Sequence, residues 1–157
     1  MNKLTHVDQQ GNPAMVDVSN KDVSQRMAKA ESRVRLGQAI IDLLQGEEIY
    51  TKKGPVFQTA IIAGTQGAKK TSELIPFCHP VGLDDCKIDI RIEGEDAVIT
   101  CTAKVTAKTG IEMEAITGAS VAAITIYDMC KAMSHEIEIK NTRLLEKTGG
   151  KKDFFRA

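Results

Sequence analysis

Two neighbouring stretches of the chain alternate apolar and polar residues with a period of two, which is the pattern of strands that bury one face. Residues 86–92 alternate isoleucines with charged residues, and residues 97–106 alternate apolar residues with threonines and Lys104. The short acidic segment at residues 93–96 contains Gly94 and separates the two stretches. Together they predict a β-hairpin with one face in the core.

The same periodicities predict further elements around this hairpin. These are strands over residues 28–36 and 136–145, and helices over residues 38–45, 56–70 and 111–133. Gly64 and Gly67 in the second helix permit the close approach of another backbone. Pro76 and Pro80 exclude regular structure from residues 75–82.

This order of elements, β-α-β-β-α-β, predicts an α+β fold of the ferredoxin-like kind, an antiparallel sheet with its helices on one face. A chain of 157 residues has the size of one domain, so we expect residues 1–157 to form a single domain. Residues 1–22 are predicted to be irregular. Residues 147–157 are a glycine-rich basic tail that we expect to be mobile.

The predicted helix over residues 111–133 has a polar side and a wide apolar girdle around the rest of its surface. At 100° per residue, the polar side holds Glu114, Thr117, Ser120, Thr125, Asp128 and Lys131. The girdle is wider than one sheet face covers. We therefore expect this helix to be buried on two sides, the second against another subunit, and the protein to be oligomeric.

Charge and composition exclude several classes of function. Lysine plus arginine and aspartate plus glutamate both number 21, so the formal net charge is zero, which argues against non-specific binding of nucleic acid. No apolar run approaches the ~20 residues that span a bilayer, and the first ten residues lack the apolar core of a signal peptide. We therefore expect no membrane partner and a cytoplasmic location. The 4 cysteines and 3 histidines match no zinc or iron–sulfur spacing, so we expect reduced thiols, no metal and no cofactor.

Two groups of side chains could carry chemistry, and each has a structural role as its alternative. Asp128 and Lys131 could belong to a site, with the carboxylate partly buried by the girdle, but pairs of this spacing are more often exposed ion pairs. Glu114 lies about 21 Å away along the helix axis, so one site can use it together with Asp128 only with a long ligand or a second subunit. Cys78 and His79 lie in the proline-clamped loop, where His79 could transfer protons or serve only the loop structure. No stretch has the spacing of a P-loop, so phosphates would have to bind to dispersed lysines.

Five stretches are distinctive when they are read together. They are MVDVS at residues 15–19, LIPFCHP at residues 74–80, KTGIEMEA at residues 108–115, AAITIYDMCKA at residues 122–132 and RLLEKTGGK at residues 143–151. With these stretches the chain resembles, over essentially its whole length, the MoaC family, the cyclic pyranopterin monophosphate synthases of molybdenum cofactor biosynthesis. The resemblance implies a ferredoxin-like subunit in a homohexamer, a trimer of dimers with active sites between subunits.

The resemblance also implies a reaction and a set of site residues. The substrate would be (8S)-3′,8-cyclo-7,8-dihydroguanosine 5′-triphosphate, and a lyase reaction would give cyclic pyranopterin monophosphate and pyrophosphate. The positions implied to be catalytic are Asp128, Lys131, Lys53, His79 and Glu112. Those implied to bind substrate are Phe77, Cys78, His79, Met113, Glu114 and Lys147, with Asp17 and Arg26 as weaker candidates.

These residue types suit that chemistry. Lysines can bind a triphosphate and stabilise the departing pyrophosphate, and a histidine and carboxylates can transfer the protons that ring opening and closure require. The alternative from another class is a catalytically idle oligomer that binds a nucleotide as a regulator. A metal-dependent phosphotransferase is disfavoured because no clustered carboxylates offer a two-metal site.

Overall fold

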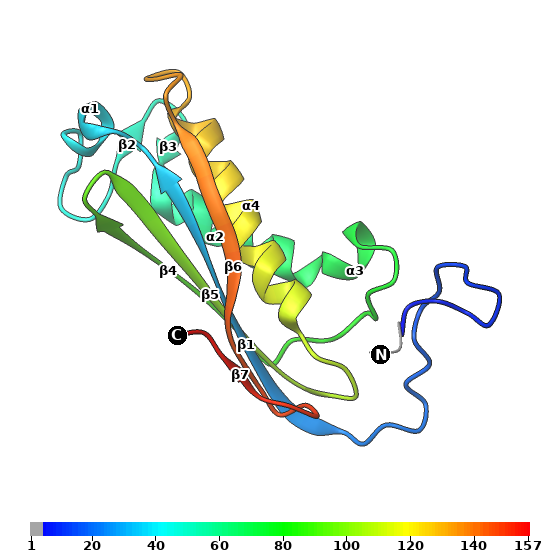
Figure 1. Cartoon of the computed structure of the whole chain (residues 1–157). Coiled ribbons are helices and arrows are strands. Elements are labelled where there is room, and N and C mark those ends of the chain that lie inside the picture. The colour runs from blue at the N-terminus through cyan, green and yellow to red at the C-terminus, as the bar shows by residue number, and fades with distance from the viewer. Residues whose placement is uncertain (1–4) are drawn as a thin grey trace.

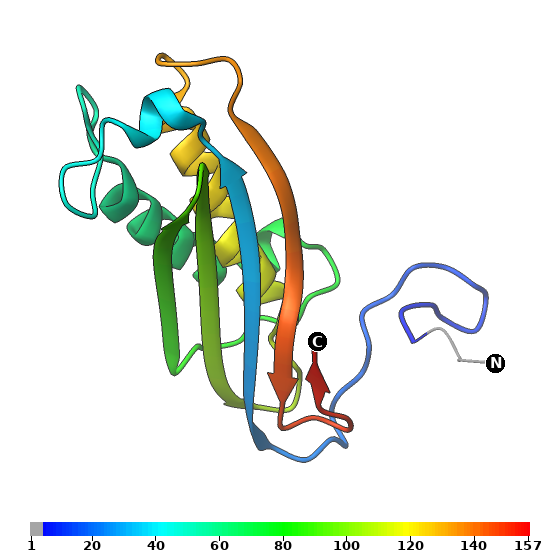
Figure 2. The same ribbon diagram turned by 60° about the vertical axis from the view of Figure 1, so that its left-hand side comes forward.

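The computed structural model describes residues 5–157 as an antiparallel sheet with helices against one of its faces (Figures 1 and 2). The elements are β1 (Ser24–Arg35), α1 (Gln38–Ile41), β2 (Tyr50–Thr51), β3 (Gly54–Pro55), α2 (Val56–Lys69), α3 (Thr71–Leu74), β4 (Asp85–Glu93), β5 (Asp96–Ala107), α4 (Glu112–Cys130), β6 (Glu138–Thr148) and β7 (Phe154–Phe155). In this part of the chain the main sheet has the order β4-β5-β1-β6-β7 with antiparallel neighbours, and β2 pairs with β3. No helix within residues 5–157 is long and apolar enough to cross a membrane.

The structure confirms a mixed α+β fold with an antiparallel sheet, and the predicted hairpin is β4 and β5. The predicted helix over residues 38–45 ends at Ile41, and tighter turns follow it in which Leu43 and Leu44 donate to carbonyls three residues back. Four short elements, β2, β3, α3 and β7, have no counterpart in the prediction, because two to four residues are too few to show a period.

The two ends of the chain differ in how much regular structure they hold. Residues 5–22 form neither helix nor strand, apart from an isolated bridge between Val7 and Pro13, and residues 1–4 of the predicted irregular segment lie outside the described residues. The tail that we expected to be mobile begins inside β6, which includes Lys147, and it returns as β7 to pair with β6. Strand pairing therefore continues into this tail.

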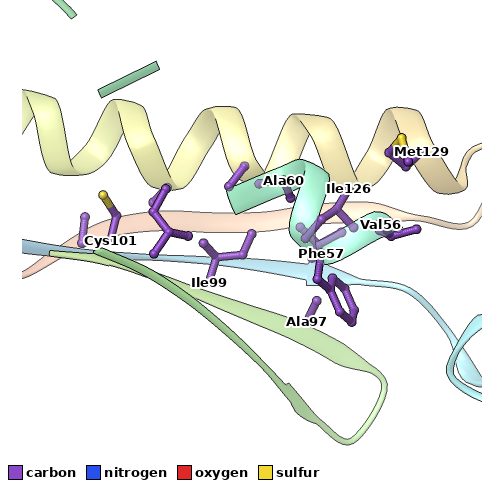
Figure 3. Packing of buried hydrophobic residues seen from close by; sticks show 14 of the residues in the cluster. Val56, Phe57, Ala60, Ala97, Ile99, Cys101, Ile126 and Met129 are labelled. Atoms are coloured by element: carbon purple, nitrogen blue, oxygen red, sulfur yellow. The ribbon is translucent and has the colours of Figure 1, made fainter. Parts of the chain in front are cut away.

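The core lies between the sheet and the pair of helices α2 and α4. Figure 3 shows Ile99 and Cys101 of β5 below α4, which contributes Ile126, while Phe57 and Ala60 of α2 pack beside them. The core-facing positions of β5 are those that the alternation predicts, since every second residue from Ala97 to Val105 belongs to the core, although Val98 and Thr100 on the opposite face are buried as well. Burial of this one face is what fixes the register of the strand.

The helix α4 is buried on two sides, as its apolar girdle predicts. One side packs on β1, β5 and β6, but the other packs on α2 of the same chain, which corrects the expectation of another subunit there. Met113, Ile124 and Tyr127 are the large apolar side chains of α4 that stay exposed. The girdle therefore gives no argument for oligomerisation.

Glycines bring α2 and α4 into unusually close contact, as predicted for Gly64 and Gly67. A Cβ atom on Gly64 would lie 2.7 Å from the carbonyl oxygen of Gly118 in α4 and 2.5 Å from Cδ1 of Ile88. A Cβ atom on Gly67 would lie 2.7 Å from Cγ2 of Val121. The backbones of α2 and α4 are in contact at this crossing. The short distance between the two helix axes is possible only because the glycines have no side chains.

A buried carboxylate caps the start of α2 from a distance in the sequence. Neither Pro55 nor its neighbours provide a side-chain cap. Instead, Glu48 accepts hydrogen bonds from the backbone N–H groups of Phe57 at 2.8 Å and Gln58 at 3.1 Å, and also from that of Ile49 at 2.8 Å. The Glu48 carboxylate lies at the positive end of the helix dipole, and this interaction stabilises both the carboxylate and the start of α2.

We predict that Gly64→Ala destabilises the protein by about 1–2 kcal/mol in urea unfolding, because overpacking outweighs the gain in helix propensity. Propensity alone would give the opposite sign, a gain of about 1 kcal/mol. The control is Gly82→Ala, where the added Cβ meets nothing within 4 Å, and we expect it to stay near the wild-type stability. A Gly64→Ala variant more stable than the wild type would contradict the close crossing.

Candidate active site

A carboxylate between two lysines lies at the C-terminal end of α4. Asp128 is in the last turn of α4, Lys131 directly follows the helix, and Lys53 lies in the turn between β2 and β3. The Asp128 Oδ1 atom is 2.8 Å from Nζ of Lys131, and Oδ2 is 2.9 Å from Nζ of Lys53, which also donates to the Asp128 carbonyl at 3.3 Å. In Figure 1 the β2–β3 hairpin lies at the same end of the molecule as this end of α4.

The two ammonium groups set the charge state of this cluster. Their hydrogen bonds, that of Lys131 first, lower the pKa of Asp128 to about 2, and the same bond raises the pKa of Lys131. The Asp128 carboxylate and the Lys131 ammonium group therefore stay charged through the neutral pH range. The side chain of Asp128 is 50% exposed, as the favoured interpretation of an exposed ion pair predicts, and the alternative of partial burial is wrong because α2 covers the girdle and leaves this carboxylate at the surface. Such a cluster can bind an anion or hold an ionised base.

A cavity of about 380 Å³ lies at the opposite end of α4. Its lining includes the predicted residues Phe77, Cys78, His79, Glu112, Met113 and Glu114. The loop after α3 supplies the first three and the first turn of α4 the others. The structure thus brings together side chains that are about 35 residues apart in the sequence, because the loop and the helix start meet at one end of the sheet.

His79 is held by a backbone contact from the N-terminal segment. Its Nε2 atom lies 2.6 Å from the carbonyl oxygen of Val16. A carbonyl oxygen can only accept, so Nε2 carries a proton, and in the neutral ring Nδ1 is the nitrogen that can accept one. This contact leaves His79 as a proton-transfer group with one defined basic atom.

The acidic groups of the cavity have different environments. Glu114 is 4% exposed, and burial, helped by the negative charge of Glu112, raises its pKa. Glu112 instead forms an ion pair with Lys147, whose Nζ lies 3.1 Å from Oε1. Burial also raises the pKa of the Cys78 thiol, with further increases from Glu114 and Glu112, which disfavours its reactive thiolate form. Glu114 is the group in this cavity suited to hold and donate a proton.

A second cavity, of about 600 Å³, adjoins the first and is strongly basic. It is lined by Lys21, Arg26, Lys147, Lys151 and Lys152, and it shares Lys21, Gly110, Glu112 and Lys151 with the first cavity. The Arg26 guanidinium is fixed by donating to the carbonyls of Ala107 at 3.1 Å and Lys108 at 3.2 Å. A cavity with proton-transfer groups therefore adjoins a cavity lined by cations, an arrangement suited to a phosphorylated ligand.

The two ends of α4 are not brought together within one chain. Glu114 and Asp128 are separated by about 21 Å along the helix axis, and Lys53, Asp128 and Lys131 line neither of the two cavities. In the described part of the chain, no three His, Cys, Asp or Glu side chains gather as metal ligands would.

Comparison of the sequence with known proteins shows the family to which this chain belongs. A model of the MoaC family matches residues 15–150. The chain belongs to the MoaC family. The cyclic pyranopterin monophosphate synthase of Xanthomonas oryzae pv. oryzae is 52% identical over 152 residues, which cover 96% of this chain and 92% of that protein.

Two longer relatives contain the same region as part of a larger chain. The molybdenum cofactor biosynthesis bifunctional protein of Synechocystis is 54% identical over 155 residues, or 96% of this chain and 45% of that protein. Molybdenum cofactor biosynthesis protein 1 of Dictyostelium discoideum is 43% identical over 168 residues, or 96% of this chain and 27% of that protein. The chain thus spans less than half the length of these two MoaC-family proteins.

The cavities are also lined by residues that were not among the predicted site residues, and these include Val16, Lys21, Lys151 and Lys152. Val16 and Lys151 belong to stretches that match the MoaC family, which could have indicated them, whereas Lys21 lies in a segment without any pattern. The weaker candidate Asp17 accepts hydrogen bonds from Ser19, which lower its pKa and fix the turn next to Val16. Arg26 lines the basic cavity.

We predict that Glu114→Gln becomes progressively more stable relative to the wild type as pH rises from the acid range through the folded-state pKa of Glu114. A raised pKa means that the native protein keeps this proton to a higher pH than the unfolded chain does, so its contribution to stability is present at low pH and is lost as pH rises through the folded pKa. Urea unfolding at each pH measures the difference. The exposed Glu47→Gln is the control and should show no such trend. A Glu114→Gln difference that is flat with pH would contradict the buried, protonated carboxyl group.

Proposed function

We propose that this chain is a cyclic pyranopterin monophosphate synthase in molybdenum cofactor biosynthesis, a phosphorus–oxygen lyase. Its substrate would be (8S)-3′,8-cyclo-7,8-dihydroguanosine 5′-triphosphate and its products cyclic pyranopterin monophosphate and pyrophosphate. The observation that carries the proposal is the pair of adjoining cavities, one with proton-transfer groups and one with cations. Membership in the MoaC family and identity to synthases of that name over 96% of the chain support it.

The product chemistry defines what the two cavities must do. A cyclic monophosphate with release of pyrophosphate requires a sugar hydroxyl to attack the α-phosphorus while the bond to the β-phosphate breaks. A base must take the hydroxyl proton, and cations must stabilise the charge on the departing pyrophosphate. Conversion of the purine-derived rings to a pterin adds further proton transfers.

We assign these tasks to residues by their environments. His79 accepts protons at Nδ1, and Glu114, which burial favours in its protonated form, donates one. Phe77, Cys78 and Met113 line the cavity around the rings, and Glu112 orients Lys147. Arg26, Lys147 and Lys151 bind the triphosphate in the basic cavity.

The Asp128 cluster enters the same site through assembly. The side chains of Lys53, Asp128 and Lys131 are each at least half exposed and lie at the far end of α4 from the two cavities. They can therefore contact the cavity of a neighbouring subunit. We propose a homohexamer, a trimer of dimers, in which each active site combines one end of α4 from one subunit with the other end from its neighbour. Asp128 stays ionised there, and the two lysines act on substrate charge.

Fold and location complete the proposal. The element order and the strand order β4-β5-β1-β6, antiparallel throughout, support a ferredoxin-like fold for one domain over residues 1–157. The reduced state of Cys78, Cys86, Cys101 and Cys130 supports a cytoplasmic location. We propose no nucleic-acid and no membrane partner, in line with the zero net charge.

The direct test is release of pyrophosphate from the cyclic dihydroguanosine triphosphate. We expect the wild type to release it and Lys131→Ala to lose at least about a hundredfold in kcat, because a cation at the site of developing charge is lost. The thermal midpoint should stay near that of the wild type, since the Lys131 side chain is 56% exposed. Lys87→Ala, an exposed lysine on the uncovered face of β4, is the control and should keep full activity. Binding of the substrate without release of pyrophosphate would instead indicate a nucleotide-binding regulator.

The shared site is tested by mixing two inactive variants. Co-expressed His79→Ala and Lys131→Ala chains should recover about a quarter of the wild-type rate, because half of the dimers are hybrids and each hybrid holds one intact site of two. The same ratio of His79→Ala with a His79→Ala, Lys131→Ala double variant is the control and should stay inactive, since no hybrid then contains an intact site. If the first mixture also stays inactive, each chain uses its own residues, and the proposed assembly of the site is wrong.

A further inference from the structure

Two cysteines outside the candidate site lie against each other on neighbouring strands. The register between β4 and β5 pairs Cys86 with Ala103 and Ile88 with Cys101, so Cys86 and Cys101 are diagonal neighbours on the core face of the sheet. Their Sγ atoms are 3.9 Å apart, which is near van der Waals contact for two sulfurs. Neither residue lines the cavities described above.

The two thiols differ in how solvent reaches them. Cys101 is 0% exposed, and its sulfur is turned toward α4 (Figure 3), where a Cβ atom on Gly118 would lie 2.7 Å from it. Cys86 is partly exposed and lines a separate cavity of about 470 Å³ at the sheet edge, together with Lys69 and Asp85. An oxidant from solvent therefore meets Cys86 first, with Cys101 directly behind it.

The contact between the sulfurs also shifts the pKa values of the two thiols in opposite directions. The hydrogen bond between the sulfurs lowers the pKa of Cys86, although burial and Asp85 act against this, whereas the same bond and burial raise the pKa of Cys101. The thiolate, which is the reactive form, is thus favoured on the accessible residue.

Closure of a bond between the sulfurs requires the two strands to move closer at this point, because diagonal neighbours lie near the upper limit of the Cα separation that a disulfide spans. A disulfide has an S–S distance of about 2.0 Å, so the sulfurs would approach by roughly 1.9 Å. Cys101 is held from above by α4, so the movement falls on β4. Within residues 5–157, β4 is an edge strand that pairs with β5 alone, and it can shift without breaking a second ladder.

We propose that Cys86 and Cys101 form a peroxide-sensitive dithiol that closes to an intramolecular disulfide between β4 and β5. In the first step the Cys86 sulfur attacks one oxygen of hydrogen peroxide, the O–O bond breaks, and Cys86 becomes a sulfenic acid as one water leaves. In the second step the Cys101 sulfur attacks the Cys86 sulfur, the S–O bond breaks, and a second water leaves. Two thiols and one peroxide thus give one disulfide and two waters, and a dithiol reductant reverses the change.

The test treats the full-length protein with hydrogen peroxide, blocks the remaining thiols under denaturing conditions and maps the peptides by mass spectrometry. We expect a cross-linked peptide pair that contains Cys86 and Cys101, a loss of 2 of the 4 free thiols for this pair, and full recovery with dithiothreitol. Because this readout needs no substrate, it holds or fails independently of the proposed synthase activity.

Two variants resolve the order of the steps. Cys101→Ala should leave Cys86 as a sulfenic acid that dimedone traps, whereas Cys86→Ser should protect Cys101 from peroxide altogether. Wild-type protein in which Cys86 gains oxygen atoms without a bridge to Cys101 would overturn the proposal, as would protein in which neither thiol reacts. The wild-type map decides the question even if a variant at the buried Cys101 fails to fold.

Discussion

The close crossing of α2 and α4 is the contact on which the rest of the structure depends. Gly64 meets the backbone of Gly118 there, and the sulfur of Cys101 supports the same point from the sheet below. Cores are packed as densely as crystals of small molecules, so a wider crossing would tilt α4 as a whole. Because α4 carries Glu114 at one end and Asp128 at the other, the absence of side chains at Gly64 of α2 and Gly118 of α4 sets the position of both groups of functional residues.

The acidic candidate residues at the two ends of α4 lie in opposite environments of the helix dipole, which favours those in the first turn and disfavours the one in the last turn. Glu112 and Glu114 lie in the first turn, where the helix dipole favours negative charge. Asp128 lies in the last turn, where the dipole disfavours negative charge, and the hydrogen bonds from Lys131 and Lys53 offset this and lower its pKa to about 2. A residue that opposes local preference is the kind of inconsistency that marks functional positions.

Periodicity was sufficient to predict the sheet and the long helices but not the contacts that complete the sites. The alternation in β5 identified its buried face because one face of a sheet is either in the core or out of it. The spacing of Asp128 and Lys131 predicted their ion pair because both lie on one helix. The contact between Lys53 and Asp128 joins residues 75 positions apart through a hairpin of two-residue strands, which leaves no periodic signal. The exposed ion pair that the spacing of Asp128 and Lys131 favours is present, and the alternative, partial burial of Asp128 by the girdle, is wrong because α2 of the same chain covers the second apolar side of α4. Motifs shared with a family indicated the candidate residues, and helix geometry already separated Glu114 from Asp128. Only the structure placed the other candidates at one end of α4 or the other.

The remote cap on α2 has a consequence for the order of folding. The Glu48 carboxylate joins residues 48 and 58 and so closes a short loop that has Lys53 near its tip. Loops of about ten residues close within roughly 10–100 ns, far faster than distant strands pair. Since the first turn of a helix is the costly one to form, a carboxylate that accepts its free N–H groups lowers the barrier to nucleating α2. The turn that presents Lys53 can therefore take shape together with the start of α2, before α4 arrives with the carboxylate that Lys53 will bind.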